Sequence, residues 1–242
     1  MTLQRLVVDP IQMQADQLHL TAEQQRYLHR VLRYRPGDRF MALDGHGHQW
    51  LAELTPDLAL AVVVSPGASV VPAPQVDITL MAALPKGNSF DQVVRQATEL
   101  GVSCIQPVIS DRTLLHPSPK RLDRWRRIAA EAMEQSEQPR VPPILAPCPW
   151  SSLLIPSPEA RYLCVARQDA PSLLACLLQQ SYRRITIAIG PEGGWSPSEV
   201  EAALVAGFQP VSLGNTVLRA VTAPVVALAV AHAAANLQAV DH

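Results

Sequence analysis

Two stretches decide the fold of this chain: Ile185-Thr-Ile-Ala-Ile-Gly-Pro-Glu-Gly-Gly194 and Val211-Ser-Leu-Gly-Asn-Thr-Val-Leu-Arg-Ala-Val-Thr-Ala223. Each begins as a short apolar run with β-branched residues, stops at glycine and leads into a helix-start signal. Glycine lets the backbone approach a ligand closely, and the helix N-terminus behind it offers N–H groups that have no partner within the helix. Segments of this kind form ligand sites at the carboxyl ends of strands in α/β proteins.

The alternation of strands and helices extends back from these stretches to residue 76. The predicted strands are 76–83, 105–109, 162–166, 185–189 and 210–213, and the predicted helices begin near residues 88, 118, 171, 196 and 223. Such alternation is typical of a mostly parallel sheet that is covered by helices.

Residues 1–64 predict a small, mostly β unit with one helix. Thr21 and Gln24 have the spacing of a capping box, and the helix that they start is expected to run to about Arg33. The predicted strands are 6–8, 39–43, 49–54 and 58–64, with a hairpin signal at Asp44-Gly45. The proline-rich segment 65–75 predicts a linker. We therefore expect two domains, over 1–70 and 76–242.

The composition is that of a globular protein, with 48% apolar and 17% charged residues in a chain of 242. Because the net charge is only −1, any contact with nucleic acid must come from local clusters. Arginine makes up 18 of the 20 basic residues. This skew suits phosphate recognition, but genomic composition explains it at least as well.

The cysteines predict buried, reduced thiols of a cytosolic protein, because they form no CxxC pair and, with scattered histidines, no zinc site. They are Cys104, Cys148, Cys164 and Cys176. The N-terminus shows no signal peptide. The longest apolar helix, from Ala223 to about Leu237, falls short of the roughly 20 apolar residues that a membrane span needs. We therefore expect a cytoplasmic protein that binds no metal and enters no membrane.

The turn at 190–194 is neither a GxGxxG motif nor a P-loop with its lysine, and Glu192 would repel a phosphate. A neutral or cationic ligand, such as an adenosine with a sulfonium, fits this turn better. Leu213, Val217 and Leu218 could wall an apolar slot for an adenine ring. Arg219 precedes the last helix, where a salt bridge at the helix start is as good an interpretation as a functional role.

Two arginine-rich stretches are candidates for contact with a nucleic-acid backbone. Arg26, Arg30 and Arg33 have the spacing of one helical face, and only Asp38 offsets the charge of that stretch. The second stretch is 120–127. For it we prefer a solvated helix face, which is the usual explanation of a charge run.

Several short motifs then stand out along the whole chain. They are His29-Arg-Val-Leu-Arg33 with Pro36-Gly-Asp38; Leu84-Pro-Lys-Gly87 with Gln96-Ala-Thr-Glu-Leu-Gly101; Arg112; Trp125 with Glu131 and Glu134-Gln-Ser136; Ile189-Gly-Pro-Glu-Gly-Gly194; and Leu213-Gly214 with Val217-Leu-Arg219 and Thr222-Ala223. Together, and in this order, they resemble the ribosomal RNA small-subunit methyltransferase E family, one of the SPOUT (trefoil-knot) methyltransferases.

The resemblance implies an α/β fold in two domains. The N-terminal domain would be a PUA-like β-barrel that binds RNA. The C-terminal SPOUT domain would be a mostly parallel sheet with helices on both faces, and its end would be threaded as a trefoil knot. The resemblance also implies a homodimer, S-adenosyl-L-methionine as the methyl donor, and N3-methylation of a uridine in small-subunit (16S) ribosomal RNA, within the assembled or assembling small ribosomal subunit.

The resemblance further implies which residues form the site. Three loops would hold the cofactor through Leu163, Val165, Ala166, Ile189, Gly190, Gly194, Leu213, Gly214, Val217 and Leu218. For catalysis we expect Arg219 first and Arg112 second, because an arginine fork can stabilise a uracil anion. Glu192 would be a general base, an adenosine contact or a residue that fixes the turn. RNA contacts would come from Arg5, Arg30, Arg33 and Lys86.

Two alternatives stay open. The motifs do not separate RNA substrates well, so the chain could be a SPOUT methyltransferase that acts on another RNA, such as tRNA. The family usually has Thr-Glu where this chain has Ala220-Val221, and Gly-Arg where it has Glu137-Gln138. The difference at Ala220-Val221 is the reason for the second alternative, a catalytically impaired RNA-binding protein of ribosome assembly.

Overall fold

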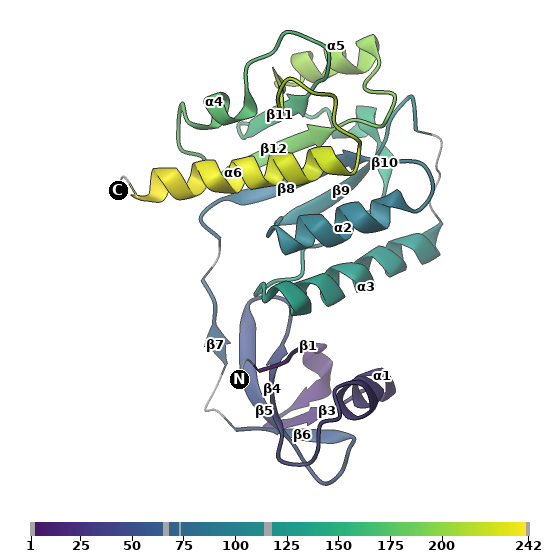
Figure 1. Cartoon of the computed structure of the whole chain (residues 1–242), viewed down its shortest axis with the longest axis vertical. Helices are drawn as coiled ribbons and strands as arrows, with labels where there is room; N and C mark the ends of the chain where they lie inside the picture. Colours follow the sequence, from purple (N-terminus) through teal and green to yellow (C-terminus); the bar gives the residue numbers. More distant parts are fainter. Residues whose placement is uncertain (1–2, 65–67, 73, 114–117, 241–242) are drawn as a thin grey trace. The chain divides into compact units, whose positions relative to one another are not determined.

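The computed structural model describes residues 3–64, 68–72, 74–113 and 118–240, and these residues fold as two compact units (Figure 1). The first unit comprises the described residues of Met1–Ala73 together with Ala130–Val141, and the second unit comprises those of Pro74–Ala129 and Pro142–His242. The predicted linker lies partly outside the described residues, at 65–67 and 73.

A seven-stranded sheet forms the first unit. Its strands are β1 (Arg5–Val7), β2 (Met13–Gln14), β3 (Gln17–His19), β4 (Arg39–Leu43), β5 (His48–Leu54), β6 (Leu60–Val63) and β7 (Ser69–Val70). They lie in the order β1-β4-β5-β6-β3-β2, with β7 paired to β5. The pair β1–β4 is parallel, and the other pairs are antiparallel. The hairpin expected at Asp44-Gly45 joins β4 to β5.

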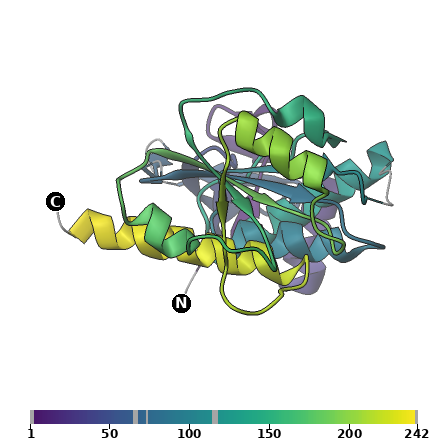
Figure 2. The same cartoon turned by 90° about the horizontal axis from the view of Figure 1, so that it is seen from above.

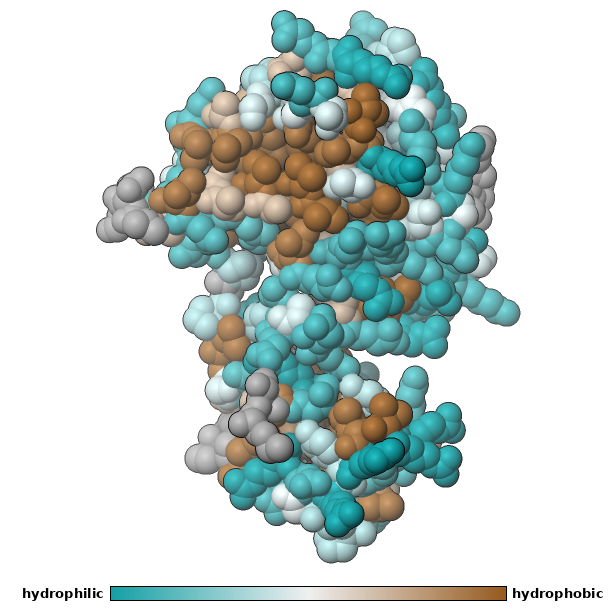
Figure 3. Space-filling view, viewed as in Figure 1, coloured by the Kyte–Doolittle hydropathy of each residue, from teal (hydrophilic) through white to brown (hydrophobic). Residues whose placement is uncertain are grey.

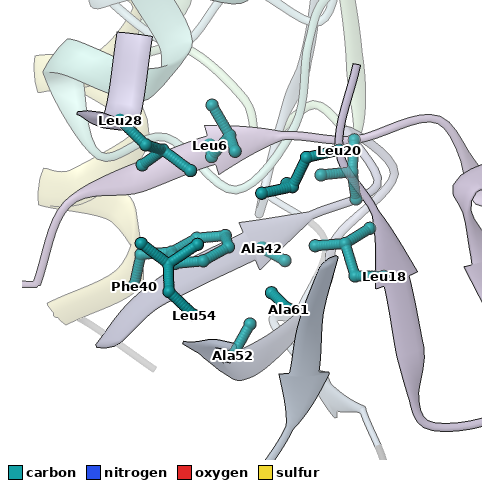
Figure 4. Packing of buried hydrophobic residues seen from close by; sticks show 10 residues of the cluster. Leu6, Leu18, Leu20, Leu28, Phe40, Ala42, Ala52, Leu54 and Ala61 are labelled. Carbon is teal, nitrogen blue, oxygen red and sulfur yellow. The ribbon is translucent and has the colours of Figure 1, made fainter. Parts of the chain in front are cut away.

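The core of the first unit follows the alternation of these strands. Successive side chains of a strand point to opposite faces, so Phe40 and Ala42 of β4 and Ala52 and Leu54 of β5 are buried on one face. Leucines from β1, β3 and the helical segment complete the cluster, as Figure 4 shows. This shared apolar cluster stabilises a sheet whose strands are individually short.

The helical part of the first unit begins as predicted but ends differently. Its segments are η1 (Pro10–Gln12), α1 (Ala22–Arg26) and η2 (Tyr27–Val31). The capping box between Thr21 and Gln24 is formed. The helix then widens into the π-helical turn η2, and Arg33 lies beyond its end with a φ of 60°. The single helical face predicted for Arg26, Arg30 and Arg33 is therefore wrong, because the winding changes and the last arginine has left the helix.

Two segments of the first unit differ from what the sequence predicts. Inside the predicted linker, β7 pairs with β5, so this part of the linker extends the sheet. Within Ala130–Val141, Glu134 accepts a hydrogen bond from the backbone N–H of Val7 at 2.5 Å, and Arg140 donates to the carbonyl oxygen of His46. These bonds join residues that lie far apart in the sequence, and no local pattern predicts them.

A six-stranded sheet in which every pair is parallel forms the second unit. Its strands are β8 (Asp77–Ala83), β9 (Cys104–Ile109), β10 (Cys148–Pro149), β11 (Ala160–Cys164), β12 (Arg184–Ile189) and β13 (Gln209–Val211). They lie in the order β10-β9-β8-β12-β11-β13. The predicted α/β fold with a mostly parallel sheet is confirmed.

Helices cover both faces of this sheet, as predicted (Figure 2). The helical segments are α2 (Ser89–Glu99), α3 (Pro119–Ser136), η3 (Trp150–Leu153), α4 (Leu173–Leu177), α5 (Pro197–Val205) and α6 (Thr222–Val240). On one face α5 packs on η3, and on the other α6 packs on α2, α4, β8 and β12. The trefoil knot that the resemblance implies stays a prediction.

Two strands of the second sheet end earlier than predicted, β11 at Cys164 and β13 at Val211. Beyond these ends the two loops bond to each other: Val165 N–H donates to the carbonyl of Val211 at 3.0 Å, and Ser212 N–H to that of Pro171 at 2.8 Å. The residues after both strands therefore lie in loops at the carboxyl edge of the sheet.

The last helix, α6, is longer than predicted. Its segment Thr222–Ala239 has a mean hydropathy of 1.2 and is long and apolar enough to cross a membrane. The expectation that this helix falls short of a span therefore does not hold for length and composition. About 28% of the segment is buried within the chain, and its exposed apolar residues are Ala229, Ala233, Leu237 and Ala239.

Candidate functional site

A cavity of about 560 Å³ lies in the second unit at the carboxyl ends of β11, β12 and β13. Its walls come mainly from the loops after these three neighbouring strands, over 164–170, 189–195 and 212–218. Parallel strands bring such loops to one edge of the sheet. The volume falls within the range of about 300–1,000 Å³ that is typical of small-molecule sites.

The cavity gathers the expected cofactor-binding residues except one. Those that line it are Val165, Ala166, Ile189, Gly190, Gly194, Leu213, Gly214, Val217 and Leu218. Leu163 does not line the cavity, because its side chain is fully buried in the core beside Ala188 and Trp195.

The glycine turn after β12 closes around a tryptophan. Gly194 N–H donates to the Pro191 carbonyl at 2.8 Å, and a Cβ on Gly190 would lie 3.1 Å from Nε1 of Trp195. The Trp195 ring packs on Trp150 with 4.6 Å between centroids and lines the cavity. Its Nε1 is buried without a hydrogen-bond partner among the described residues. Trp195 is not among the residues predicted from the sequence, where its only signal is its place directly after the turn.

Residues from two further loops meet the same turn. Arg112, after β9, lines the cavity and donates from Nη1 to the carbonyl of Gly193. Glu192 also lines the cavity, and its Oε1 accepts the backbone N–H of Lys86, after β8, at 3.1 Å. The fold therefore brings three predicted site residues, Arg112, Glu192 and Lys86, to one side of the glycine turn.

Arg219 lies next to the cavity but not among its lining residues. Its side chain is exposed, and its carbonyl accepts the N–H groups of Thr222 and Ala223 at the start of α6. The neighbours Leu218 and Ala220 do line the cavity. Arg219 takes part in none of the ion pairs between described residues, so the helix-start salt bridge is not formed.

The basic residues expected to contact RNA differ in their surroundings. Arg30 and Arg33 are exposed and enter no ion pair within the described part of the chain. Arg5 already pairs with Glu137 at 3.2 Å, and its side chain is only 21% exposed. Lys86 is exposed in the second unit. Arg30, Arg33 and Lys86 are therefore the stronger candidates.

The four thiols are free, but only Cys176 is buried as predicted, whereas Cys104, Cys148 and Cys164 are partly exposed. Cys164 lines the cavity, but burial raises the pKa of its thiol to about 12. A thiol with so high a pKa carries almost no thiolate near pH 7, so it is no nucleophile. Among the described residues, no group of three or more His, Cys, Asp or Glu side chains could hold a metal ion.

Two family models match this chain. The RNA methyltransferase domain matches residues 72–232, and the RNA methyltransferase PUA domain matches residues 20–64. Together with the parallel sheet and the cavity at its carboxyl edge, these matches define the class of the protein: an RNA methyltransferase with an N-terminal PUA domain.

Relatives narrow this class. The ribosomal RNA small subunit methyltransferase E of Synechocystis sp. is 47% identical over 234 residues, which are 93% of this chain and 76% of that protein. The crystal structure of the same enzyme from Neisseria gonorrhoeae, bound to S-adenosyl methionine, is 31% identical with a TM-score of 0.82 and covers 94% of this chain and 96% of that one. A Legionella pneumophila methyltransferase in complex with SAM is 26% identical with a TM-score of 0.84, over 97% and 98% of the two chains. This chain belongs to the ribosomal RNA small subunit methyltransferase E family.

Proposed function

We propose that this chain transfers a methyl group from S-adenosylmethionine to N3 of a uridine in small-subunit (16S) ribosomal RNA, in the cytoplasm, within the assembled or assembling small subunit. The observation that carries the proposal is the cavity whose walls are the loops after β11, β12 and β13. It is lined by all of the residues that the resemblance assigns to the cofactor except Leu163, and the relatives from Neisseria gonorrhoeae and Legionella pneumophila were solved with that cofactor.

The lining of the cavity fits S-adenosylmethionine. Ile189, Leu213 and Val217 offer apolar surface for an adenine ring. The cofactor carries a sulfonium, and the carboxylate of Glu192 stands at the wall, where it favours a cation over a phosphate. The unpartnered Nε1 of Trp195 would regain a hydrogen bond from an acceptor of the ligand, which supports binding because a buried donor without a partner is costly.

Transfer to N3 requires that the uracil loses its N3 proton. When bound, S-adenosylmethionine supplies an electrophilic methyl group on its sulfonium. N3 lies on the Watson–Crick edge, so the uridine must be unpaired or flipped out of a helix. We assign to Arg219, and second to Arg112, the stabilisation of the negative charge that develops on O2 or O4. We assign to Glu192 the role of fixing the turn, because Oε1 is already bonded to the backbone of Lys86.

The departure at Ala220-Val221 affects the two positions differently. Ala220 lines the cavity, whereas Val221 does not. The hydroxyl that relatives usually carry at the first position would therefore face the ligand, but the carboxylate usual at the second position would not.

Contacts to RNA would come from Arg30 and Arg33 of the first unit and Lys86 of the second, with a smaller contribution from the paired Arg5. Each neutralised phosphate of a single strand releases counterions, so the logarithm of affinity should fall with the logarithm of salt concentration by about 0.7 per contact. Binding that does not change with salt would contradict these contacts.

The protein would act as a homodimer through the apolar surface of α6. Figure 3 shows apolar side chains gathered over α6 on this face of the second unit. Leu174 of α4, Leu178 directly after α4 and Leu237 of α6 are exposed. A contiguous exposed apolar patch is typical of a protein interface. The variant Ala229→Glu, on an exposed position of α6, should shift the protein to a monomer in light scattering. Val205→Glu on α5 is the matched control and should stay dimeric.

The catalytic assignment is tested with Arg219→Ala. We expect a loss of roughly 10²–10³-fold in kcat, since removal of a donor to a developing oxyanion has this size, with no change in melting temperature. Arg183→Ala, an exposed arginine outside the cavity, is the matched control. Normal turnover by Arg219→Ala would refute its role.

The substrate is tested separately. Small-subunit rRNA and tRNA from a strain that lacks the protein would be incubated with enzyme and labelled cofactor, as naked RNA and as assembled subunits. Methylated nucleotides would then be mapped by mass spectrometry. A label in tRNA alone would favour the first alternative. Tight cofactor binding in calorimetry without any methylation would favour an impaired enzyme.

A further inference from the structure

Glu199 is a buried carboxylate that accepts one more hydrogen bond than its role in the helix cap requires. Its side chain lies in the first turn of α5, and the residue is only 5% exposed. Oε2 accepts the backbone N–H of Ser196 at 2.7 Å, which completes the capping box. Oε1 accepts a second N–H, that of Asp111 at 2.9 Å, in the loop after β9. No ion pair between described residues includes Glu199.

A buried carboxylate without a cation is unfavourable unless hydrogen bonds satisfy both oxygens. An uncharged capping residue such as glutamine would serve the cap alone. The bond from Asp111 N–H is the one that requires a carboxylate at this position. A carboxylate can accept a hydrogen bond on each of its two oxygens, whereas an amide offers one acceptor and one donor group.

The bond to Asp111 fixes the residue that precedes Arg112. A second bond supports the same loop, since the Asp111 carboxylate accepts the Ser196 hydroxyl at 2.6 Å. From this loop the Arg112 side chain reaches the wall of the cavity and donates a hydrogen bond to the carbonyl oxygen of Gly193. The two residues are closely packed, because a Cβ added to Gly193 would lie only 3.1 Å from Cδ of Arg112. The guanidinium forms no ion pair with a described residue, so its charge is available to a substrate.

We infer that Glu199 is a positioning residue: it holds the backbone of Asp111 and thereby places Arg112 at the wall of the cavity. The inference rests on the proposed function, because it gives Arg112 a task there. Glu199 itself does not line the cavity and acts through Arg112 alone.

The test is a double-mutant cycle with Glu199→Gln and Arg112→Ala in the full-length chain. Glutamine keeps the size of the side chain and one acceptor but sets an NH2 group against the other N–H donor. A displacement of a catalytic group by about 1 Å can cost roughly 100-fold in rate, so we expect Glu199→Gln to lower kcat by about 10- to 100-fold. Affinity for S-adenosylmethionine in calorimetry should change by less than about 3-fold, well within the effect of losing one hydrogen bond.

The cycle separates positioning from general structural support. If Glu199 acts through Arg112, adding Glu199→Gln to Arg112→Ala should cause no further loss of kcat. Equal losses in both backgrounds would overturn the inference. Glu201→Gln, the same substitution at an exposed position of the same helix, is the matched control and should leave kcat unchanged.

Hydrogen exchange provides a readout that does not depend on catalysis. The Asp111 amide should exchange faster in Glu199→Gln than in the wild type, and exchange at the wild-type rate would also overturn the inference. If the wild-type chain methylates no RNA, the proposed function fails. Hydrogen exchange would still report whether Glu199 holds the Asp111 amide.

Discussion

Glu134 makes the stability of the first unit depend on pH in a direction unusual for an acidic residue. Burial, with a smaller contribution from the charge of Glu131, raises the pKa of Glu134 from 4.5 to about 7, although the hydrogen bond from Val7 N–H opposes this. The folded protein therefore holds the proton more tightly than the unfolded chain. The stabilisation by the protonated form is complete below pH 4.5 and is lost as pH rises to 7.

The magnitude follows from this shift. At about 1.4 kcal/mol per pKa unit, moving from 4.5 to about 7 corresponds to a penalty of about 3 kcal/mol above pH 7. Glu134→Gln carries no charge at any pH, and its amide oxygen can still accept the N–H of Val7. We expect the variant to match the wild type near pH 4.5 and to be more stable at pH 8 by up to about 3 kcal/mol.

Urea denaturation between pH 4.5 and 8 measures this difference as the free energy of unfolding of the two proteins. Other titrating groups are common to both, so they cancel in the difference. Glu131→Gln is the control, because it removes only the minor contribution and should recover a small part of the gain. The reasoning would be refuted if the variant and the wild type differed in free energy of unfolding by the same amount at pH 4.5 and pH 8. It would also be refuted if the wild type were more stable than Glu134→Gln at pH 8.

Three further substitutions have effects that the structure predicts. Arg33→Gly should stabilise the chain by about 1 kcal/mol in urea denaturation, because glycine adopts the left-handed φ of 60° without strain. It should weaken RNA binding as much as Arg33→Ala does. An Arg33→Ala variant that is also more stable than the wild type would contradict this explanation. Gly190→Ala should lower the free energy of unfolding by roughly 1–3 kcal/mol, because the added Cβ would lie 3.1 Å from Nε1 of Trp195. It should also weaken cofactor binding in calorimetry. An unchanged affinity would show that the Trp195 ring moves freely. Trp150→Phe should lower the free energy of unfolding by about 1 kcal/mol, since it loses the bond to the Glu199 carbonyl at 3.3 Å, but should bind cofactor as the wild type does.

Features that depend on neighbours in sequence could be predicted. A capping box needs only residues three apart: the one predicted at Thr21 and Gln24 forms at the start of α1, and α5 begins with another at Ser196 and Glu199. The alternation of apolar strands with capped helices was enough to predict the parallel sheet. The position of the cavity followed as well, because the glycine turns stand at strand ends and parallel strands collect their carboxyl ends at one edge.

Features that depend on winding or on long loops could not be predicted. The spacing of Arg26, Arg30 and Arg33 assumes an α-helix, and the π-helical turn of η2 changes that face without any local signal. Leu163 belongs to an apolar run like its neighbours, and only packing decides that its side chain enters the core. The exposed surface of α6 likewise follows from which elements it packs on.

By itself the sequence determined the two strand–glycine–helix stretches, their caps and the family that they resemble, since these depend on local backbone preferences and on residue types. Only the tertiary structure decided what surrounds the turn at 190–194. Arg112 and Lys86 reach it from 81 and 106 residues away, and Glu199 links it to the loop of Asp111. The order of strands in the sheet sets these meetings, because it brings the loops after β8, β9 and β12 to neighbouring positions.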